Sequence, residues 1–135
     1  MKSLPVPPAT VTPDNAPFFA ALQDGRLDLP RCDDCDAVVW YPRHHCPACG
    51  GSSLTWFTAS GRGAVYSFTV VRRGQGEWEA AAPYVLAYVE LDEGPRVLTN
   101  ILTEDPSQVR IGARVEAVVE RGEGAPPVLR FRLGV

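Results

Sequence analysis

The sequence has no long apolar run, and no apolar segment stands near its N-terminus. A helix that spans a bilayer needs about 20 apolar residues, and no stretch of the 135 residues approaches that length. Prolines at positions 5, 7, 8 and 13 interrupt the region where a signal peptide would need an unbroken apolar segment. We therefore expect a cytoplasmic protein without a membrane span, in a compartment where thiols stay reduced.

Basic residues are also scarce. Thirteen Lys and Arg residues, with Lys2 as the only lysine, stand against sixteen Asp and Glu residues, so the net charge is −3 and the pI is about 5.3. A dedicated binder of nucleic acid usually has a strongly basic surface. This composition therefore argues against that class of function.

The sequence offers few groups for catalysis. His44 and His45 are the only histidines, and we expect both to be exposed or hydrogen-bonded turn residues. There is no phosphate-binding glycine loop, no His–Glu metal motif, and no serine or cysteine nucleophile with an obvious base. An enzyme that acts alone is therefore not expected.

Four cysteines form the clearest motif. Cys32 and Cys35 make one Cys-x-x-Cys pair, Cys46 and Cys49 make a second, and ten residues separate the pairs. Two residues between thiolates let a tight turn direct both sulfurs at one point, and two such turns complete the tetrahedral shell that zinc accepts. Four protein ligands leave no open position, so we expect a structural zinc site. Iron in a rubredoxin-like site is the main alternative.

The N-terminal part has two segments before the cysteines. Residues 1–13 contain four prolines and few apolar residues, which predicts an extended or disordered tail. Asp14 or Asn15 can then cap a helix that carries Phe18, Phe19 and Leu22 and ends at Gly25. So short a helix has to dock on another surface.

From residue 61 onward the apolar pattern has the period of β-strands. Alternation predicts five strands, near residues 65–71, 85–91, 97–102, 113–120 and 129–133. Several are apolar on both faces, as expected when a small sheet curls around its own core. The pattern is typical of a small OB-like barrel, with an SH3-like barrel or a short sandwich as alternatives.

In this order, the segments resemble the DUF35 family. The resemblance covers about residues 14–135 and is carried by the helix, the two cysteine pairs, the Tyr41-Pro42-Arg43 segment, the strand Gly61 to Val71, Pro83-Tyr84-Val85 and Glu90 to Gly94. Asp36 stands where the family often has glycine. The resemblance implies a mainly β protein, with an N-terminal helix and rubredoxin-like zinc ribbon at residues 14–58 and a five-stranded OB-fold barrel at residues 59–135.

The resemblance also implies a function. Members of the family look like accessory subunits of acyl-CoA metabolism, without catalytic residues of their own. They associate with thiolase-fold enzymes (acyltransferases, ketoacyl-CoA thiolases or lipid-transfer-type aldolases that shorten steroid side chains), and some associate with MaoC-like hydratases. They bridge subunits and help to bind or channel an acyl-CoA thioester. We therefore expect such a partner for this chain.

Candidate residues for CoA or partner binding lie mainly after the first barrel strand. Arg72 and Arg73 could bind CoA phosphates through charge-assisted hydrogen bonds, and Trp78 could cover the adenine or anchor a partner. Arg62 and Arg96 are weaker candidates of the same kind. An ordinary hairpin loop with solvated arginines is the alternative interpretation.

Two other functions remain open at this point. Zinc ribbons and OB folds both occur in proteins that bind single-stranded nucleic acid, although the charge of −3 argues against it. An iron-loaded site would instead indicate electron transfer.

Overall fold

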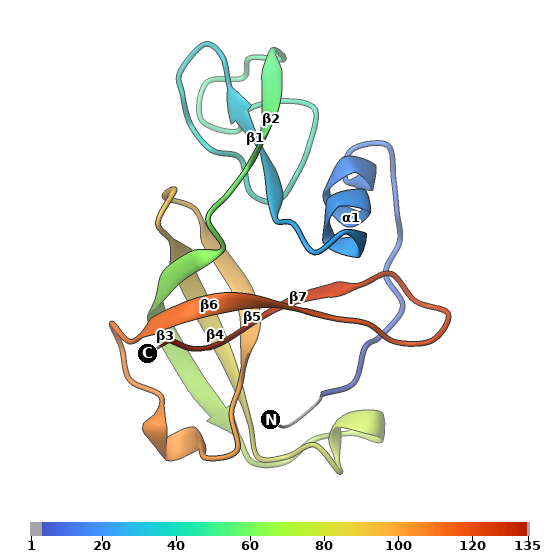
Figure 1. Cartoon of the computed structure of the whole chain (residues 1–135), viewed down its shortest axis with the longest axis vertical. Helices are drawn as coiled ribbons and strands as arrows, with labels where there is room; N and C mark the ends of the chain where they lie inside the picture. The colour runs from blue at the N-terminus through green and yellow to red at the C-terminus, as the bar shows by residue number, and fades with distance from the viewer. Residues whose placement is uncertain (1–3, 135) are drawn as a thin grey trace.

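The structure, a computed structural model, describes residues 4–134. It consists of a two-stranded ribbon, which carries the four cysteines, above a β-barrel (Figure 1). The elements in chain order are α1 (Ala16–Gln23), β1 (Asp28–Cys32), β2 (Leu54–Thr58), β3 (Arg62–Val71), η1 (Gly76–Trp78), β4 (Tyr84–Leu91), β5 (Arg96–Leu102), η2 (Pro106–Gln108), β6 (Arg114–Glu120) and β7 (Val128–Leu133). Here η marks a short 3-10 helix. Nothing in residues 4–134 forms a helix of the length and apolarity that crossing a membrane requires.

The five long strands close into a barrel in the order β3-β4-β5-β7-β6. The β5–β7 pair is parallel, and the other neighbours are antiparallel. Each strand begins within three residues of its predicted start, so the predicted mainly β fold with a five-stranded barrel is confirmed. The strand pattern is informative here because inward and outward residues alternate along every strand of a small barrel.

The sequence did not predict β1 and β2. They pair antiparallel across the cysteine region, with Asp28 opposite Thr58 and Cys32 opposite Leu54. Pro30 lies in the middle of β1, and proline argues against a strand because it cannot donate a ladder hydrogen bond. In a two-stranded sheet every strand is an edge strand, and this tolerates the proline.

Helix α1 packs its apolar side on the barrel and on β1. Phe18 and Leu22 of the helix share one buried cluster with Leu29 of β1 and with barrel residues such as Val89 and Phe131. Gly25 has a φ of +82°, the left-handed conformation predicted for the end of the helix. The helix and the ribbon therefore cover one end of the barrel rather than standing apart from it.

The N-terminal segment contacts the barrel at Leu4 and Pro5, unlike the extended or disordered tail that the sequence predicted. Residues 1–3 of the predicted tail lie outside the described residues, and residues 4–13 have no helix or strand. Leu4 is nevertheless buried against Ala81 and Leu102. Arg130 on β7 donates hydrogen bonds to the carbonyls of Leu4 and Pro5, because its buried guanidinium needs acceptors that the barrel alone does not supply.

Candidate metal centre and predicted binding residues

The two cysteine pairs lie on turns with the same backbone geometry. The N–H of Asp36 donates to the carbonyl of Cys32 at 2.9 Å, and the N–H of Gly50 donates to the carbonyl of Cys46 at 2.8 Å. Asp36 has a φ of 67° and Gly50 a φ of 78°. Aspartate enters this left-handed region more easily than most residues, so Asp36 forms the turn that glycine forms in the second pair.

The four sulfurs of Cys32, Cys35, Cys46 and Cys49 converge on one point. All four Sγ atoms lie within 4.8 Å of one another, and the Cys32–Cys49 and Cys35–Cys46 pairs are each separated by 3.6 Å. Four sulfurs placed tetrahedrally at about 2.3 Å from one ion would be about 3.8 Å apart. The cysteines are therefore positioned to bind a metal ion, as the sequence predicted.

The four thiols differ in burial and in acidity. Cys32 and Cys46 are buried, whereas Cys35 and Cys49 are exposed. The backbone N–H of Ala37 lowers the pKa of Cys35, but the thiols of Cys46 and Cys49 outweigh it and raise this pKa to about 12. The backbone N–H of Cys49 lowers the pKa of Cys46 to about 7, against the effect of burial. A metal ion would have to displace the protons that these thiols share.

Polar contacts hold the two cysteine turns in place. The Asp33 carboxylate accepts hydrogen bonds from the hydroxyls of Ser53 at 2.9 Å and Thr55 at 2.8 Å, which fixes the first turn to β2. His44 Nδ1 lies 2.5 Å from the carboxylate of Asp14, next to the N-terminal end of α1. His44 is thus an exposed turn residue, one of the two placements that the sequence predicted for it.

In the predicted CoA-binding loop after β3, Trp78 packs against other residues of the protein. The Trp78 ring packs against Tyr84 with 4.7 Å between centroids, and the guanidinium of Arg130 lies 5.7 Å from the Trp78 centroid. Arg72 and Arg73 are exposed, and within residues 4–134 the structure gives their side chains no hydrogen bond or ion pair. Trp78 therefore anchors the loop to the barrel, whereas Arg72 and Arg73 are exposed.

Arg62 and Arg96 lie elsewhere on the barrel. Arg96 Nε donates to the Glu90 carboxylate at 3.0 Å, and the Arg96 guanidinium stacks 3.9 Å from the Tyr66 centroid. Arg62 begins β3 and Arg72 follows its last residue, so they stand about 30 Å apart along an extended strand. The structure therefore does not bring the five predicted binding residues into one site.

Two surface features were missed by sequence reasoning. The first is an outer face of the barrel with four exposed large apolar side chains, which are Tyr66, Leu86, Tyr88 and Leu98. Their alternate spacing was visible in the sequence, but strands that are apolar on both faces were attributed to the core. The second is a cleft of about 390 Å³ between the end of α1 and β6, which no motif indicated.

Comparisons with known proteins match both parts of the chain. The family model for the rubredoxin-like zinc ribbon domain of ChsH2 matches residues 19–55, and the model for the C-terminal OB-fold domain of ChsH2 matches residues 56–120. The predicted zinc ribbon and OB fold are thereby confirmed. The OB assignment also decides between the barrel types that the strand pattern left open.

Two curated proteins are similar to this chain in sequence. A DUF35 domain-containing scaffold protein of Methanocaldococcus jannaschii is 39% identical over 67% of this chain and 65% of that protein. A probable enoyl-CoA hydratase alpha subunit of Thermomonospora curvata is 36% identical over 81% of this chain and 34% of that protein. This chain thus spans about two thirds of the first relative and about one third of the second.

A solved structure extends the likeness to three dimensions. The structure described as the Ltp2-ChsH2(DUF35) aldolase contains a chain that is 32% identical, covers 94% of this chain and 99% of that chain, and superposes with a TM-score of 0.82. The match spans the ribbon and the barrel together, in the same order and arrangement. The chain therefore belongs to the DUF35 family, with the ChsH2 type of zinc ribbon and OB fold.

Proposed function

We propose that this chain is an accessory subunit of a thiolase-fold enzyme that acts on an acyl-CoA thioester. The observation that carries the proposal is the match to nearly the whole DUF35 chain of an aldolase assembly. The similarity to a probable enoyl-CoA hydratase subunit supports a CoA thioester as the substrate class and a hydratase as a further partner. In this proposal the nucleophile and the base belong to the partner.

The exposed apolar face of the barrel supports the proposed association. Tyr66, Leu86, Tyr88 and Leu98 lie on neighbouring strands, with Tyr88 opposite Leu98 in the β4–β5 register. Monomeric proteins rarely expose large contiguous apolar patches unless these bind a partner. Arg96 on this face is balanced by Glu90, so the face has an aromatic and apolar centre with little net charge. Such a surface favours a protein partner over a nucleic acid.

We propose zinc as the ion of the four cysteines. Four thiolates form the donor set that structural zinc sites use, and they leave no position for water or substrate. The ion would stabilise the fold by cross-linking residues 32–35 to residues 46–49, and it would take no part in a reaction. Elemental analysis of the purified chain should find about one zinc ion per chain, whereas a coloured iron-containing preparation would favour electron transfer.

Co-purification tests the proposed association. The chain is co-expressed with candidate thiolase-fold enzymes of the same organism, and we expect one of them to elute together with it and to be active only in its presence. Leu98→Asp should abolish co-elution, because an unpaired carboxylate would be buried in the interface. Ile111→Asp is the matched control, since Ile111 is exposed outside this apolar face and its change should leave co-elution intact.

The alternative, a module that binds single-stranded nucleic acid, gives a different result. It predicts tight binding of an oligonucleotide that weakens steeply with salt. Aromatic residues on the outer face, Tyr66 and Tyr88, are the observation in its favour. Activity of the chain alone, or co-elution that Leu98→Asp does not affect, would count against the accessory-subunit proposal.

A further inference from the structure

The second half of β3, from Tyr66 to Val71, forms an open edge of the barrel. On its β6 side, β3 is in register with β6 only from Arg62 to Ala64. Val65 adds the last two hydrogen bonds on this side, because its N–H donates to the carbonyl of Ala113 at 3.0 Å and its carbonyl accepts from the N–H of Gly112 at 2.8 Å. Figure 1 shows the rest of β3 continuing away from β6 toward the lower end of the barrel. We call residues 66–71 the β3 edge.

On its other side the β3 edge is paired with β4. Ser67 lies opposite Tyr88, and the register continues to Val71 opposite Tyr84. In an antiparallel pair, alternate residues direct their N–H and C=O groups away from the partner strand. Within residues 4–134 the structure gives these outward groups of the β3 edge no hydrogen bond. Such a row of donors and acceptors is a template to which a further strand can add.

The residues of the β3 edge do not oppose the addition of a strand. Proteins usually protect an exposed edge with charged side chains or proline, and residues 66–71 contain neither. None of these residues is buried, although Phe68 and Val70 pack against the barrel core. The β-bulge between Val65 and Ser67 stands at the start of the segment, so the residues after it keep a regular register. The edge is therefore accessible and regular.

We propose that two copies of this chain pair along the β3 edge, with β3 of one copy antiparallel to β3 of the other. The unsatisfied groups are main-chain N–H and C=O groups, and an extended main chain offers both kinds with the matching spacing. A second copy has the same unsatisfied edge, so one two-fold contact satisfies both copies. Arg72 and Arg73 follow the edge. In an antiparallel pair they lie at opposite ends, so their like charges do not face each other.

The pairing would also join the apolar faces of the two copies. The two-fold axis of an antiparallel strand pair is perpendicular to the sheet, so the same face of both copies lies on one side. Tyr66, Leu86 and Tyr88 of the exposed apolar face lie on β3 and β4, next to the proposed contact. The dimer would therefore present one apolar surface that extends across both barrels.

Sedimentation equilibrium of the full, metal-loaded chain tests the contact. We expect a dimer that dissociates on dilution, because a pair of short strands is a small interface. Hydrogen exchange measured by NMR at low and high chain concentration locates the contact. Amides of the β3 edge that face away from β4 should exchange at least about tenfold more slowly in the dimer. Amides of the same segment that face β4 are the internal reference and should be protected in both states.

A matched pair of variants separates the edge from the apolar face. Thr69 is exposed, and Thr69→Lys should weaken dimerisation at least about tenfold because a charged side chain on an edge strand opposes pairing. Leu86→Lys is the control. Leu86 is exposed and lies opposite Thr69 on β4, which has a neighbouring strand on each side, so this change should leave the dimer intact. Both variants should keep the metal content and unfolding temperature of the parent chain.

Three results would overturn the proposal. The first is a monomer at every concentration, and the second is exchange of the edge amides that does not depend on concentration. The third is loss of the dimer in Leu86→Lys but not in Thr69→Lys, which would indicate packing through the apolar face. If the edge amides become protected only when a thiolase-fold enzyme is added, the edge belongs to that partner and the pairing of copies falls. The dimer is measured on this chain alone, so its failure is distinct from a failure of the proposed association.

Discussion

Arg130 is the one charged residue that is buried within residues 4–134. Its guanidinium pairs with the carboxylate of Glu120 and donates to two N-terminal carbonyls, and only 2% of its side chain is exposed. Successive residues of a strand point to opposite faces, so Arg130 lies on the face of β7 opposite to Leu129 and Phe131. Residues 4–5 and Trp78 cover it there.

We expect Arg130→Met to lower the free energy of unfolding by about 3 kcal/mol, because the buried ion pair with Glu120 and the hydrogen bonds to the carbonyls of Leu4 and Pro5 would be lost. Urea denaturation of the metal-loaded chain measures this. Arg132→Met on the same strand is the control, since Arg132 forms an exposed pair with Glu116 and should cost no more than about 1 kcal/mol. Equal effects of the two changes would contradict the role assigned to Arg130.

The cysteine thiols make metal affinity depend on pH. A thiol must lose its proton to bind a metal, and without metal the pKa of Cys35 is about 12 while that of Cys46 is about 7. Between pH 6 and pH 8 metal binding therefore releases at least the Cys35 proton. We expect the affinity to rise at least tenfold per pH unit in a chelator competition assay, and a pH-independent affinity would contradict this.

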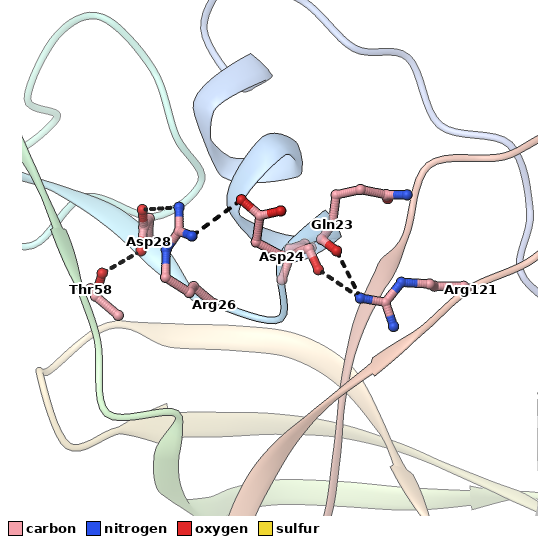
Figure 2. Close-up of polar contacts among 7 residues, drawn as sticks. Gln23, Asp24, Arg26, Asp28, Thr58 and Arg121 are labelled. Atoms are coloured by element: carbon pink, nitrogen blue, oxygen red, sulfur yellow. Dashed lines mark hydrogen bonds and ion pairs between the residues drawn. The ribbon is translucent and has the colours of Figure 1, made fainter.

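At the scale of elements, the end of α1 depends on a distant strand connection. Arg121, which follows β6, donates to the carbonyls of Gln23 at 2.9 Å and Leu22 at 3.4 Å (Figure 2). These are carbonyls at the helix C-terminal end, where a positive charge is favourable. The sequence predicted the helix and its glycine stop, but not this partner, because the residues are 98 and 99 positions apart.

We expect Arg121→Ala to lower the free energy of unfolding by about 1 kcal/mol, since it removes hydrogen bonds from the guanidinium to carbonyls at the helix end. Thermal unfolding of the metal-loaded chain is the measurement. Arg110→Ala removes the same charge from an exposed position at which, within residues 4–134, the side chain forms no hydrogen bond or ion pair, and it should change stability by less than about 0.5 kcal/mol. A similar loss in both variants would indicate a general charge effect instead.

At the scale of the whole molecule, the barrel and the cysteine turns are stabilised in different ways. The barrel is closed and has its own inward side chains, such as Val85 and Val97. The cysteine turns have only a small cluster around Cys32, Val39 and Cys46. So small an apolar cluster contributes little to the stability of these turns, and the proposed zinc ion would add a cross-link between them.

Removing the metal should therefore affect the two regions unequally. We expect amides in residues 28–58 to lose protection from hydrogen exchange after chelation, while amides of β4 and β5 stay protected. Restoring zinc should restore the protection, which controls for irreversible damage. Uniform loss of protection across the barrel would show that the barrel cannot fold without the metal.

The sequence by itself determined the features that depend on local chemistry. The Cys-x-x-Cys spacing, the turn residues Asp36 and Gly50, the helix end at Gly25 and the two-residue alternation of the barrel strands are all set by neighbours within a few positions. Each follows from backbone geometry and from the period with which side chains change face, so each could be identified without the fold.

Only the tertiary structure decided the features that join distant segments. The β1–β2 pair, the N-terminal carbonyls on Arg130, the capping of α1 by Arg121 and the cleft between α1 and β6 bring together residues far apart in the chain. A buried charge, an open strand edge and an exposed apolar face are defined by what surrounds them. The physical reason is that burial and electrostatic pairing depend on distance in space, which the order of residues does not specify.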